Sequence, residues 1–482
     1  MNAIAKETTP RKLLIGWSGR DITPPKPVNV VGQLHARVTD QVLDPLTVTA
    51  LALSDDSGRE AALMVSADIA VIEEQVYDEC RKILKERLVG FNTDWLVLNA
   101  THTHNAPAQV PLVRYPPQPE PVMPVEVYTQ LLVQGICDAA VEAWATRQPG
   151  AVGWGCGQAV VGCNRRVVYL DGAARMYGNT QDANFSHIEG YEDHGVDILC
   201  AYDCRGQLTG LIVNLACPSQ VSEALACVTA DFWHDARTEI RRRHGSALYV
   251  LPQCSAAGDQ SPHPLLKKQA AARMLVLKGL MQHGQDTRAA ERVEIGRRIA
   301  AAVDEVLPPA AQDKQSAVIF QHRVARLELP RRMITPEELA FARQTVETHK
   351  ARLAAGNQDP ASREYSSSYV HIRRFQNVIE RYERQGAVPT LPIEVHVIRL
   401  GDIAIATNRF EYFLDYGLRI KARSKAVQTF VVQLAGEGSY LPTERALQSK
   451  SYGATIENNL VTPAGGQILV NETVRLINAM FA

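Results

Sequence analysis

Two histidines, His102 and His104, close a continuous apolar run in the stretch "LVLNATHTH" (96–104). Side chains two residues apart on a strand point to the same face, so a strand through this stretch presents both imidazoles together. Imidazole binds metals and carries protons near neutral pH, and α/β folds bind ligands at the carboxyl ends of their strands. The pair therefore indicates a metal or catalytic centre. The alternative is two polar side chains that merely end a strand, because so short a motif often occurs by chance.

Two other segments place polar groups in apolar surroundings. After the apolar run "ALYVL", the segment "CSAAGDQSPHP" combines Asp259 and Ser261 with small residues, which let the backbone approach a ligand closely. In "RFEYF", Glu411 stands among aromatic residues, where a carboxylate needs a cation, a metal or a set of hydrogen bonds. The alternatives are that Asp259 caps a turn and that Glu411 pairs with Arg409 or Arg419.

The elements that must position these groups alternate between strand and helix patterns. Aliphatic runs predict strands, and apolar residues at helical spacing predict helices. Asp231 and Thr335 are predicted N-caps, and Pro336 occupies the first position of its helix. Strands are expected at 12–24, 60–71, 94–102, 196–203, 206–217, 246–254, 392–408 and 426–436, and helices at 73–90, 125–146, 230–245, 335–386 and 409–423.

This order of elements predicts an α/β fold class with a mixed β-sheet core and flanking helices. We expect one catalytic domain over 1–482, with a charged helical insertion at about 335–386. The proline-rich stretch 113–126, just after the histidine pair, is predicted to form a loop that walls the site.

Composition sets further bounds on function. The chain has 482 residues, of which 46% are hydrophobic and 21% charged, as is typical of a globular protein with a large core. A net charge of −1 gives no reason to expect nucleic acid as a partner. No apolar run reaches the ~18–20 residues of a membrane span, and the start lacks the apolar stretch of a secretory signal. These features predict a cytoplasmic protein, and they leave a homo-oligomer open.

Nine cysteines occur, none of them after Cys254, and they form no CxxC pair. A zinc knuckle or a redox dithiol is therefore not indicated. We expect most of these cysteines to be buried reduced thiols.

Five stretches, taken in order, resemble the motifs of the neutral (non-lysosomal) ceramidase family, zinc-dependent amidases that release a fatty acid from ceramide. The chain reads "THTHNAPA", "VNLACPSQ", "GDQSPH", "FEYFLDYGLRI" and "YLPTERALQSKSYGA" where the family carries "THTHSGPG", "NFAVHPT", "GDVSPN", "GEFT…SGRRL" and "YITT…QRYEG". The early "GWSGRDITPP" and "CNRR" resemble the family's opening strand and its "NR" segment. The resemblance runs over nearly the whole chain and implies a ceramidase-like catalytic domain with one Zn²⁺ per chain.

The resemblance implies a set of metal ligands. His102 matches a zinc ligand of the family. Glu411 lies six residues before Gly417, as the family's zinc-binding glutamate lies before the glycine of its "GRRL". Tyr440, in "YLPT", matches the family's tyrosine ligand.

The resemblance also implies catalytic and substrate-binding residues. His104 matches a neighbour that contacts substrate, and Tyr452, twelve residues after the tyrosine ligand, matches the tyrosine thought to stabilise the oxyanion. Ser261 matches the serine of "GDVSPN", and we prefer substrate positioning to nucleophilic attack for it because no histidine is demonstrably paired with it. Residues expected to bind substrate are Arg165 or Arg166, the arginine of the "NR" segment, together with Asp259 and Arg409.

One ligand departs from the family pattern. Where the family has a histidine before proline, this chain has Cys217 before Pro218. A thiolate is a good zinc ligand, so Cys217 is one candidate for the fourth position. The other is His234, which we favour slightly because a histidine at a helix start beside an apolar core is unusual. For either residue, a buried thiol or a surface histidine is the alternative.

Other departures bear on the substrate. The family's enzymes carry a secretion signal and a C-terminal β-sandwich domain, and this sequence shows neither. The family's "GPGEFT" becomes "TNRFEYF", which places Asn408 and Arg409 beside the presumed ligand. A guanidinium there favours a polar or anionic group, so a small soluble amide fits better than ceramide.

The expected chemistry is zinc-assisted hydrolysis, in which metal-bound water attacks a carbonyl group. Tyr452 would donate to the oxyanion, and His104 or a carboxylate would carry the proton to the leaving group. Two alternatives stay open. One is a metal-dependent esterase, lactonase or carbohydrate-active hydrolase on the same fold, and the other is a non-catalytic binding protein with a degenerate metal site.

Overall fold

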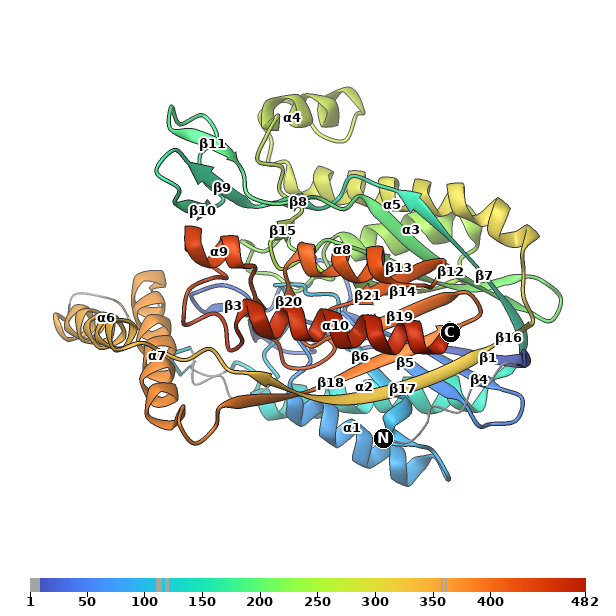
Figure 1. Ribbon diagram of the computed structural model, residues 1–482. Coiled ribbons are helices and arrows are strands. Elements are labelled where there is room, and N and C mark those ends of the chain that lie inside the picture. Colours follow the sequence, from blue (N-terminus) through green and yellow to red (C-terminus); the bar gives the residue numbers. More distant parts are fainter. Residues whose placement is uncertain (1–8, 110–114, 118–120, 357–358, 360–361) are drawn as a thin grey trace.

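Two stacked β-sheets form the centre of the computed structural model, which describes residues 9–109, 115–117, 121–356, 359 and 362–482 (Figure 1). The large sheet has the order β14-β13-β12-β7-β1-β4-β5-β6, with β16 paired to β1. Neighbouring strands in it are antiparallel except for β13 with β14 and β5 with β6. The strands are β1 (Arg11–Asp21), β4 (Thr47–Asp55), β5 (Ala61–Ala67), β6 (Leu96–Ala100), β7 (Gln148–Gln158), β12 (Gly195–Asp203), β13 (Leu208–Leu215), β14 (Tyr249–Cys254) and β16 (Ala317–Val318).

The second sheet packs face to face against the first. Its order is β17-β18-β19-β21, and its strands are β17 (Phe320–Pro330), β18 (Thr390–Leu400), β19 (Ile403–Thr407) and β21 (Gln428–Val432). Leu51 and Leu53 of β4 share one apolar cluster with Ile398 and Ile405 of the second sheet. Because successive side chains of a strand alternate in direction, Ala52 of β4 belongs to a different cluster on the opposite face. Both faces of the large sheet are therefore buried, which explains its long apolar runs.

Helices cover the outer faces of both sheets. α1 (Glu74–Arg87) and α2 (Val125–Ala145) pack on the β4–β6 part of the large sheet, and α3 (Phe232–His244) and α5 (Arg288–Gln312) pack on the β12–β14 part. α8 (Leu414–Arg423) and α10 (Pro463–Met480) cover the second sheet. The order of layers is helix, sheet, sheet, helix.

Smaller elements surround one end of these layers. α6 (Pro336–Ala354) and α7 (Arg363–Arg384) form a helical pair that projects from the sheets (Figure 1). Residues 357–358 and 360–361 of the predicted insertion lie outside the described residues. The remaining elements are η1 (Thr93–Trp95), β2 (Val28–Val30), β3 (Arg37–Thr39), β8 (Cys163–Asn164), β9 (Arg166–Tyr169), β10 (Ala174–Met176), β11 (Phe185–Ile188), β15 (Gln260–Ser261), α4 (Lys268–Leu277), β20 (Glu411–Tyr412), β22 (Tyr440–Leu441) and α9 (Glu444–Ser449).

The predicted fold class, a mixed sheet core with flanking helices, is confirmed. The predicted N-caps are present as well. The Asp231 carboxylate accepts from Phe232 N. Thr335 and Glu338 form a capping box, in which the side chain of each accepts from the backbone N–H of the other. No helix in the described part of the chain has the length and apolar character needed to cross a membrane.

Two local predictions were wrong. The helix expected over 409–423 begins only at Leu414, and Glu411 lies on the short strand β20 instead. The strand expected to carry both histidines ends at Ala100, and His102 has a left-handed backbone with φ of 64°. Both differences arise from tertiary contacts that periodicity does not record.

A buried chain of imidazoles connects the two sheets. His322 of β17 has its Nδ1 2.9 Å from the carbonyl oxygen of Ala61 in the large sheet, so this nitrogen donates. Its Nε2 lies 3.0 Å from Nδ1 of His396, whose Nε2 lies 3.0 Å from Oε1 of Glu394. Burial, followed by the nearby His396, lowers the pKa of His322 to about 3.

This buried histidine predicts a loss of stability in mild acid. The unfolded chain binds a proton on His322 near its ordinary pKa of about 6.5 whereas the folded chain does not, so the free energy of unfolding falls as pH falls below that value. A shift of this kind amounts to about 2 kcal/mol between pH 6.5 and 5. In urea titrations, the free energy of unfolding of the wild type should fall between pH 6.5 and 5 by about 2 kcal/mol more than that of His322→Gln. Exposed His187→Gln is the control, and equal slopes for wild type and H322Q would contradict the assignment.

Candidate functional site

A pairing of two very short strands places Glu411 beside Tyr440. β20 and β22 run parallel, with Glu411 opposite Tyr440 in the register. Glu411 N donates to Ser439 O at 3.0 Å. A Cβ on Gly258 would lie 2.4 Å from Glu411 O, so the glycine is required for the "AAGD" segment to pass this strand. The carboxylate and the phenol are thus held side by side by the backbone.

His102 approaches Glu411 from the end of β6. Its backbone N–H donates to Ile69 O at 3.0 Å, and its Nδ1 donates to Ala70 O at 2.5 Å. These bonds hold the left-handed turn and leave Nε2 unprotonated in the neutral ring. Nε2 lies 3.2 Å from Glu411 Oε2 and is buried without an aligned hydrogen-bond partner among the described residues.

Electrostatics at this pair favour a cation between the two side chains. Burial lowers the pKa of His102, but the Glu411 carboxylate more than offsets this, and the pKa is raised. Burial also raises the pKa of Glu411, but His102, then Tyr440 and Arg165, bring it below its ordinary value. An imidazole nitrogen and a carboxylate oxygen at this distance need a proton or a metal ion between them.

Arg165 lies behind the pair. Its guanidinium donates from Nη2 to Gly258 O at 2.9 Å and to the Tyr440 hydroxyl at 3.1 Å. The residue is only 5% exposed, so its charge acts with little screening. Burial and then Glu411 raise the pKa of Tyr440, and Arg165 opposes them. Arg165 therefore stabilises negative charge on the phenol oxygen of Tyr440.

The spacing of His102 and Glu411 is compatible with a shared zinc ion. In tetrahedral zinc sites with nitrogen and oxygen ligands, two donor atoms lie about 3.3 Å apart, and the separation of His102 Nε2 from Glu411 Oε2 matches this. No group of three His, Cys, Asp or Glu residues with metal-binding geometry occurs in the described part of the chain. The set consists instead of one imidazole, one carboxylate and one phenol.

A cavity of about 180 Å³ opens onto these donors. Tyr452 lines it, with its ring 5.6 Å from that of Tyr440 and nearly perpendicular to it. The guanidinium of Arg374, from α7, lies 5.5 Å from the Tyr452 ring centre, so the helical pair supports this wall. The predicted proline-rich wall is described only in part, because residues 113–114 and 118–120 lie outside the described residues. Within it, the Tyr115 hydroxyl donates to Gln33 O at 2.6 Å.

His104 lies beside His102 on the cavity wall. The two rings are 4.9 Å apart at 72°. Gly32 packs against the imidazole so closely that a Cβ there would lie 2.2 Å from its Cγ. Glu223 Oε2 accepts from His104 Nδ1 at 3.1 Å, and Gln220 Nε2 donates to His104 Nε2 at 2.8 Å. Burial raises the pKa of Glu223, but His104 and His263 outweigh it, and the pKa is lowered.

Ser261 and Asp259 both bond to neighbouring protein groups. The Ser261 hydroxyl accepts from Tyr177 OH at 3.1 Å and from the backbone N–H of His263 at 3.1 Å, so its hydrogen-bond partners among the described residues do not include an imidazole nitrogen that could activate it. Both Asp259 oxygens are taken by scaffold groups, Asn164 Nδ2 at 2.8 Å and Leu414 N at 2.9 Å. Asp259 therefore joins β8 to the start of α8, and the expectation of substrate contact is not supported.

The adjacent arginines Arg165 and Arg166 have different partners. Arg166 forms a two-pronged ion pair with Glu189 at 2.5 and 3.1 Å. It also donates to Tyr452 O at 2.9 Å and Lys450 O at 2.6 Å. Arg165 thus reaches the donor set, whereas Arg166 fastens the loop that carries Tyr452.

Arg409 does not line the cavity. Its Nε donates to Glu437 O, and its Nη2 lies 3.9 Å from Glu437 Oε2. Glu437, rather than Arg409, is among the lining residues. The guanidinium predicted to attract an anionic group is therefore paired with an acid at the rim.

Neither candidate for the fourth ligand lines the described cavity. Cys217 is fully buried in an apolar cluster beneath α3, and burial raises its pKa. His234 is half-buried on α3, where its backbone N–H donates to the backbone oxygen of Asp231 at 3.0 Å. The structure thus brings together His102, Glu411, Tyr440, Tyr452 and His104 and leaves Cys217 and His234 outside the lining.

Sequence reasoning missed three residues at the site. Gln220 and Glu223 follow the strand β13 in "CPSQVSE", and two polar groups just after a buried strand could have indicated them. Arg374 lies on a charged helix among many similar residues, and no sequence signal distinguishes it.

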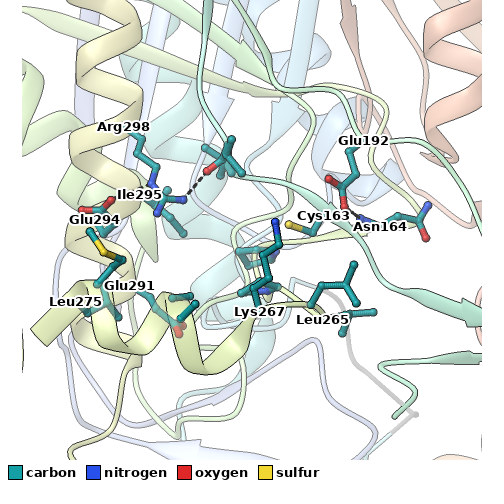
Figure 2. Close-up of a pocket in the computed structure, with 18 of the residues that line it drawn as sticks. Cys163, Asn164, Glu192, Leu265, Lys267, Leu275, Glu291, Glu294, Ile295 and Arg298 are labelled. Atoms are coloured by element: carbon teal, nitrogen blue, oxygen red, sulfur yellow. Dashed lines mark hydrogen bonds and ion pairs between the residues drawn. The ribbon is translucent and has the colours of Figure 1, made fainter. Parts of the chain in front are cut away.

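A second, largely apolar cavity of about 470 Å³ lies between β8 and the helices α4 and α5 (Figure 2). Cys163 and Asn164 form one wall, and Leu275 and Ile295 form the opposite one (Figure 2). It shares no lining residue with the His102 cavity in the described part of the chain. It is therefore separate from the candidate site.

Comparisons with known proteins identify the fold. A crystal structure of neutral ceramidase from Pseudomonas aeruginosa matches with a TM-score of 0.66 and 18% sequence identity, over 97% of this chain and 75% of that chain. A structure described as ceramidase complexed with C2 matches with a TM-score of 0.67 and 17% identity over the same shares. No protein-family model and no curated protein sequence matches the chain. The fold is ceramidase-like.

The Arg166–Glu189 pair generates a stability prediction. Its side chains are 1% and 4% exposed, so removing one partner leaves a buried charge without compensation. We expect Arg166→Met to lower the free energy of unfolding by about 3–5 kcal/mol in urea titrations. Arg475→Met removes an exposed pair with Glu472 and is expected to cost less than about 1 kcal/mol. Equal losses in the two variants would contradict this ranking.

Proposed function

We propose that this protein hydrolyses the amide bond of a small polar N-acyl compound, with one zinc ion held by His102, Glu411 and Tyr440. The observation that supports this proposal most directly is the convergence of these three donors at one cavity in a ceramidase-like fold. Donors from such distant parts of the chain meet only through the fold, and a buried imidazole facing a buried carboxylate fits a shared cation.

The surrounding residues fit this reaction. His102, Glu411 and Tyr440 would hold the zinc ion, which would lower the pKa of a water molecule towards about 7 and polarise a carbonyl oxygen. Tyr452 donates to the carbonyl oxygen as negative charge develops there. His104 accepts the proton of the attacking water and returns it to the leaving nitrogen. The water oxygen bonds to the carbonyl carbon, the C–N bond breaks, and the products are a carboxylic acid and an amine.

Cavity size and charge favour a compact substrate. A volume of about 180 Å³ is below the ~300–1,000 Å³ typical of pockets for drug-sized ligands. The described lining residues include the carboxylates of Glu73, Glu411 and Glu437 but no lysine or arginine. We therefore infer that the substrate is neutral or cationic rather than anionic.

Metal content and turnover test the proposal together. We expect about one zinc per chain by elemental analysis, and hydrolysis of small chromogenic amides that stops on chelation and returns with zinc. His102→Ala and Glu411→Gln should each lower zinc affinity and kcat/KM by about 100-fold or more. Cys217→Ser and His234→Ala, measured in the same way, test whether either residue, although outside the cavity lining, contributes a fourth ligand.

The exposed variant His187→Ala serves as the control and should retain both zinc and turnover. Ester and glycoside substrates in the same assay distinguish an amidase from other hydrolases. Absence of stoichiometric zinc, or full activity after chelation, would exclude the proposed reaction. Ligand-induced stabilisation without turnover would point to a binding protein instead.

A further inference from the structure

His104 is held at both ring nitrogens, and the two contacts agree on one tautomer. A carboxylate can only accept, so Nδ1 must carry the proton that it donates to Glu223 Oε2 at 3.1 Å. The Gln220 amide nitrogen can only donate, so Nε2 accepts from it at 2.8 Å. The ring is therefore held as the Nδ1–H form, with its basic nitrogen at Nε2.

Glu223 is itself firmly placed. The Asp231 carboxylate accepts from Val221 N at 3.1 Å and from Ser222 N at 2.6 Å, which secures the turn just before Glu223. Arg37 donates from Nη1 to Glu223 O at 2.5 Å. The backbone of this segment is tied on both sides, so the direction of the carboxylate is set by the fold.

The two oxygens of Glu223 face different groups. Oε2 accepts from His104 and from Gln33 Nε2 at 3.2 Å. Oε1 lies 3.4 Å from Tyr177 OH and 3.7 Å from His263 Nε2, and Glu223 also lines a separate open cavity. The side chain is only 17% exposed, so these contacts rather than water determine its orientation.

We propose that Glu223 is a positioning residue that holds His104 as the Nδ1–H tautomer, which leaves Nε2 as the nitrogen that accepts the proton. This role rests on the proposed hydrolysis, in which His104 moves the proton. A carboxylate behind an imidazole fixes ring orientation and tautomer in the same way in other hydrolytic sites. Gln220 occupies Nε2 before substrate binds and must yield it when the proton is transferred.

Spectroscopy tests the tautomer independently of turnover. In protein with ¹⁵N-labelled histidine, His104 should show a protonated, pyrrole-type Nδ1 and an unprotonated, pyridine-type Nε2, and its signals are identified by their loss in His104→Ala. Glu223→Met removes the acceptor at similar size, and we expect the His104 signals to change to the Nε2–H form or to an average of the two. In the same variant kcat should fall about 10- to 100-fold with KM changed less than about twofold.

Glu223→Gln provides a second variant that keeps the size and the acceptor. Gln33 and His104 both donate to the same oxygen position, so the amide oxygen of the glutamine should occupy it and retain the Nδ1–H tautomer. Gln33→Leu removes the other donor to that oxygen and should leave the tautomer unchanged.

Either of two spectroscopic outcomes would overturn the role of Glu223: an unchanged His104 tautomer in E223M, or an Nε2–H form in the wild type. A loss of kcat/KM carried only by KM would also do so. If the wild type hydrolyses nothing, the proposed function fails, while the tautomer comparison still decides whether Glu223 orients His104.

Discussion

The parallel pairing of β20 with β22 is the constraint on which the candidate site depends. Each strand has two residues, and so short a pair has no stability of its own. It persists because the surrounding core holds it, with Gly258 allowing close backbone approach and Asp259 fixing Leu414 at the start of α8. Without this pairing, Glu411 and Tyr440 would not meet, and His102 would face no carboxylate.

Burial of charge is the second organising feature of this region. Ionised groups are costly to remove from water, and the buried arginines beside the site each have defined partners. Arg165 and Arg166 illustrate the division: the first approaches Tyr440, and the second binds Glu189 and the backbone of the Tyr452 loop. One dipeptide thus supplies both the electrostatics of the donor set and the support of its wall.

Support for the site comes from several layers of the fold at once. The turn before Glu223 is held by Asp231 at the start of α3, and the wall at Tyr452 is held by Arg374 of α7. α7 also reaches the loop after β2, because Ala36 N donates to the Ser366 hydroxyl at 2.6 Å. The helical pair α6–α7, although it projects from the sheets, is therefore part of the structure around the cavity.

The sequence by itself determined the α/β class, several of the helices and the caps Asp231 and Thr335, and its resemblance to the ceramidase motifs implied that His102, Glu411 and Tyr440 belong together. Periodicity and capping are local properties, so they can be read along the chain. Only the tertiary structure decided that Glu411 lies on a strand, that His102 turns through a left-handed conformation, and that Arg409 pairs with Glu437. It also brought Glu223 to His104 across 119 residues of sequence. These contacts form between segments distant in the sequence, and their energies depend on burial and backbone pairing that no local pattern contains.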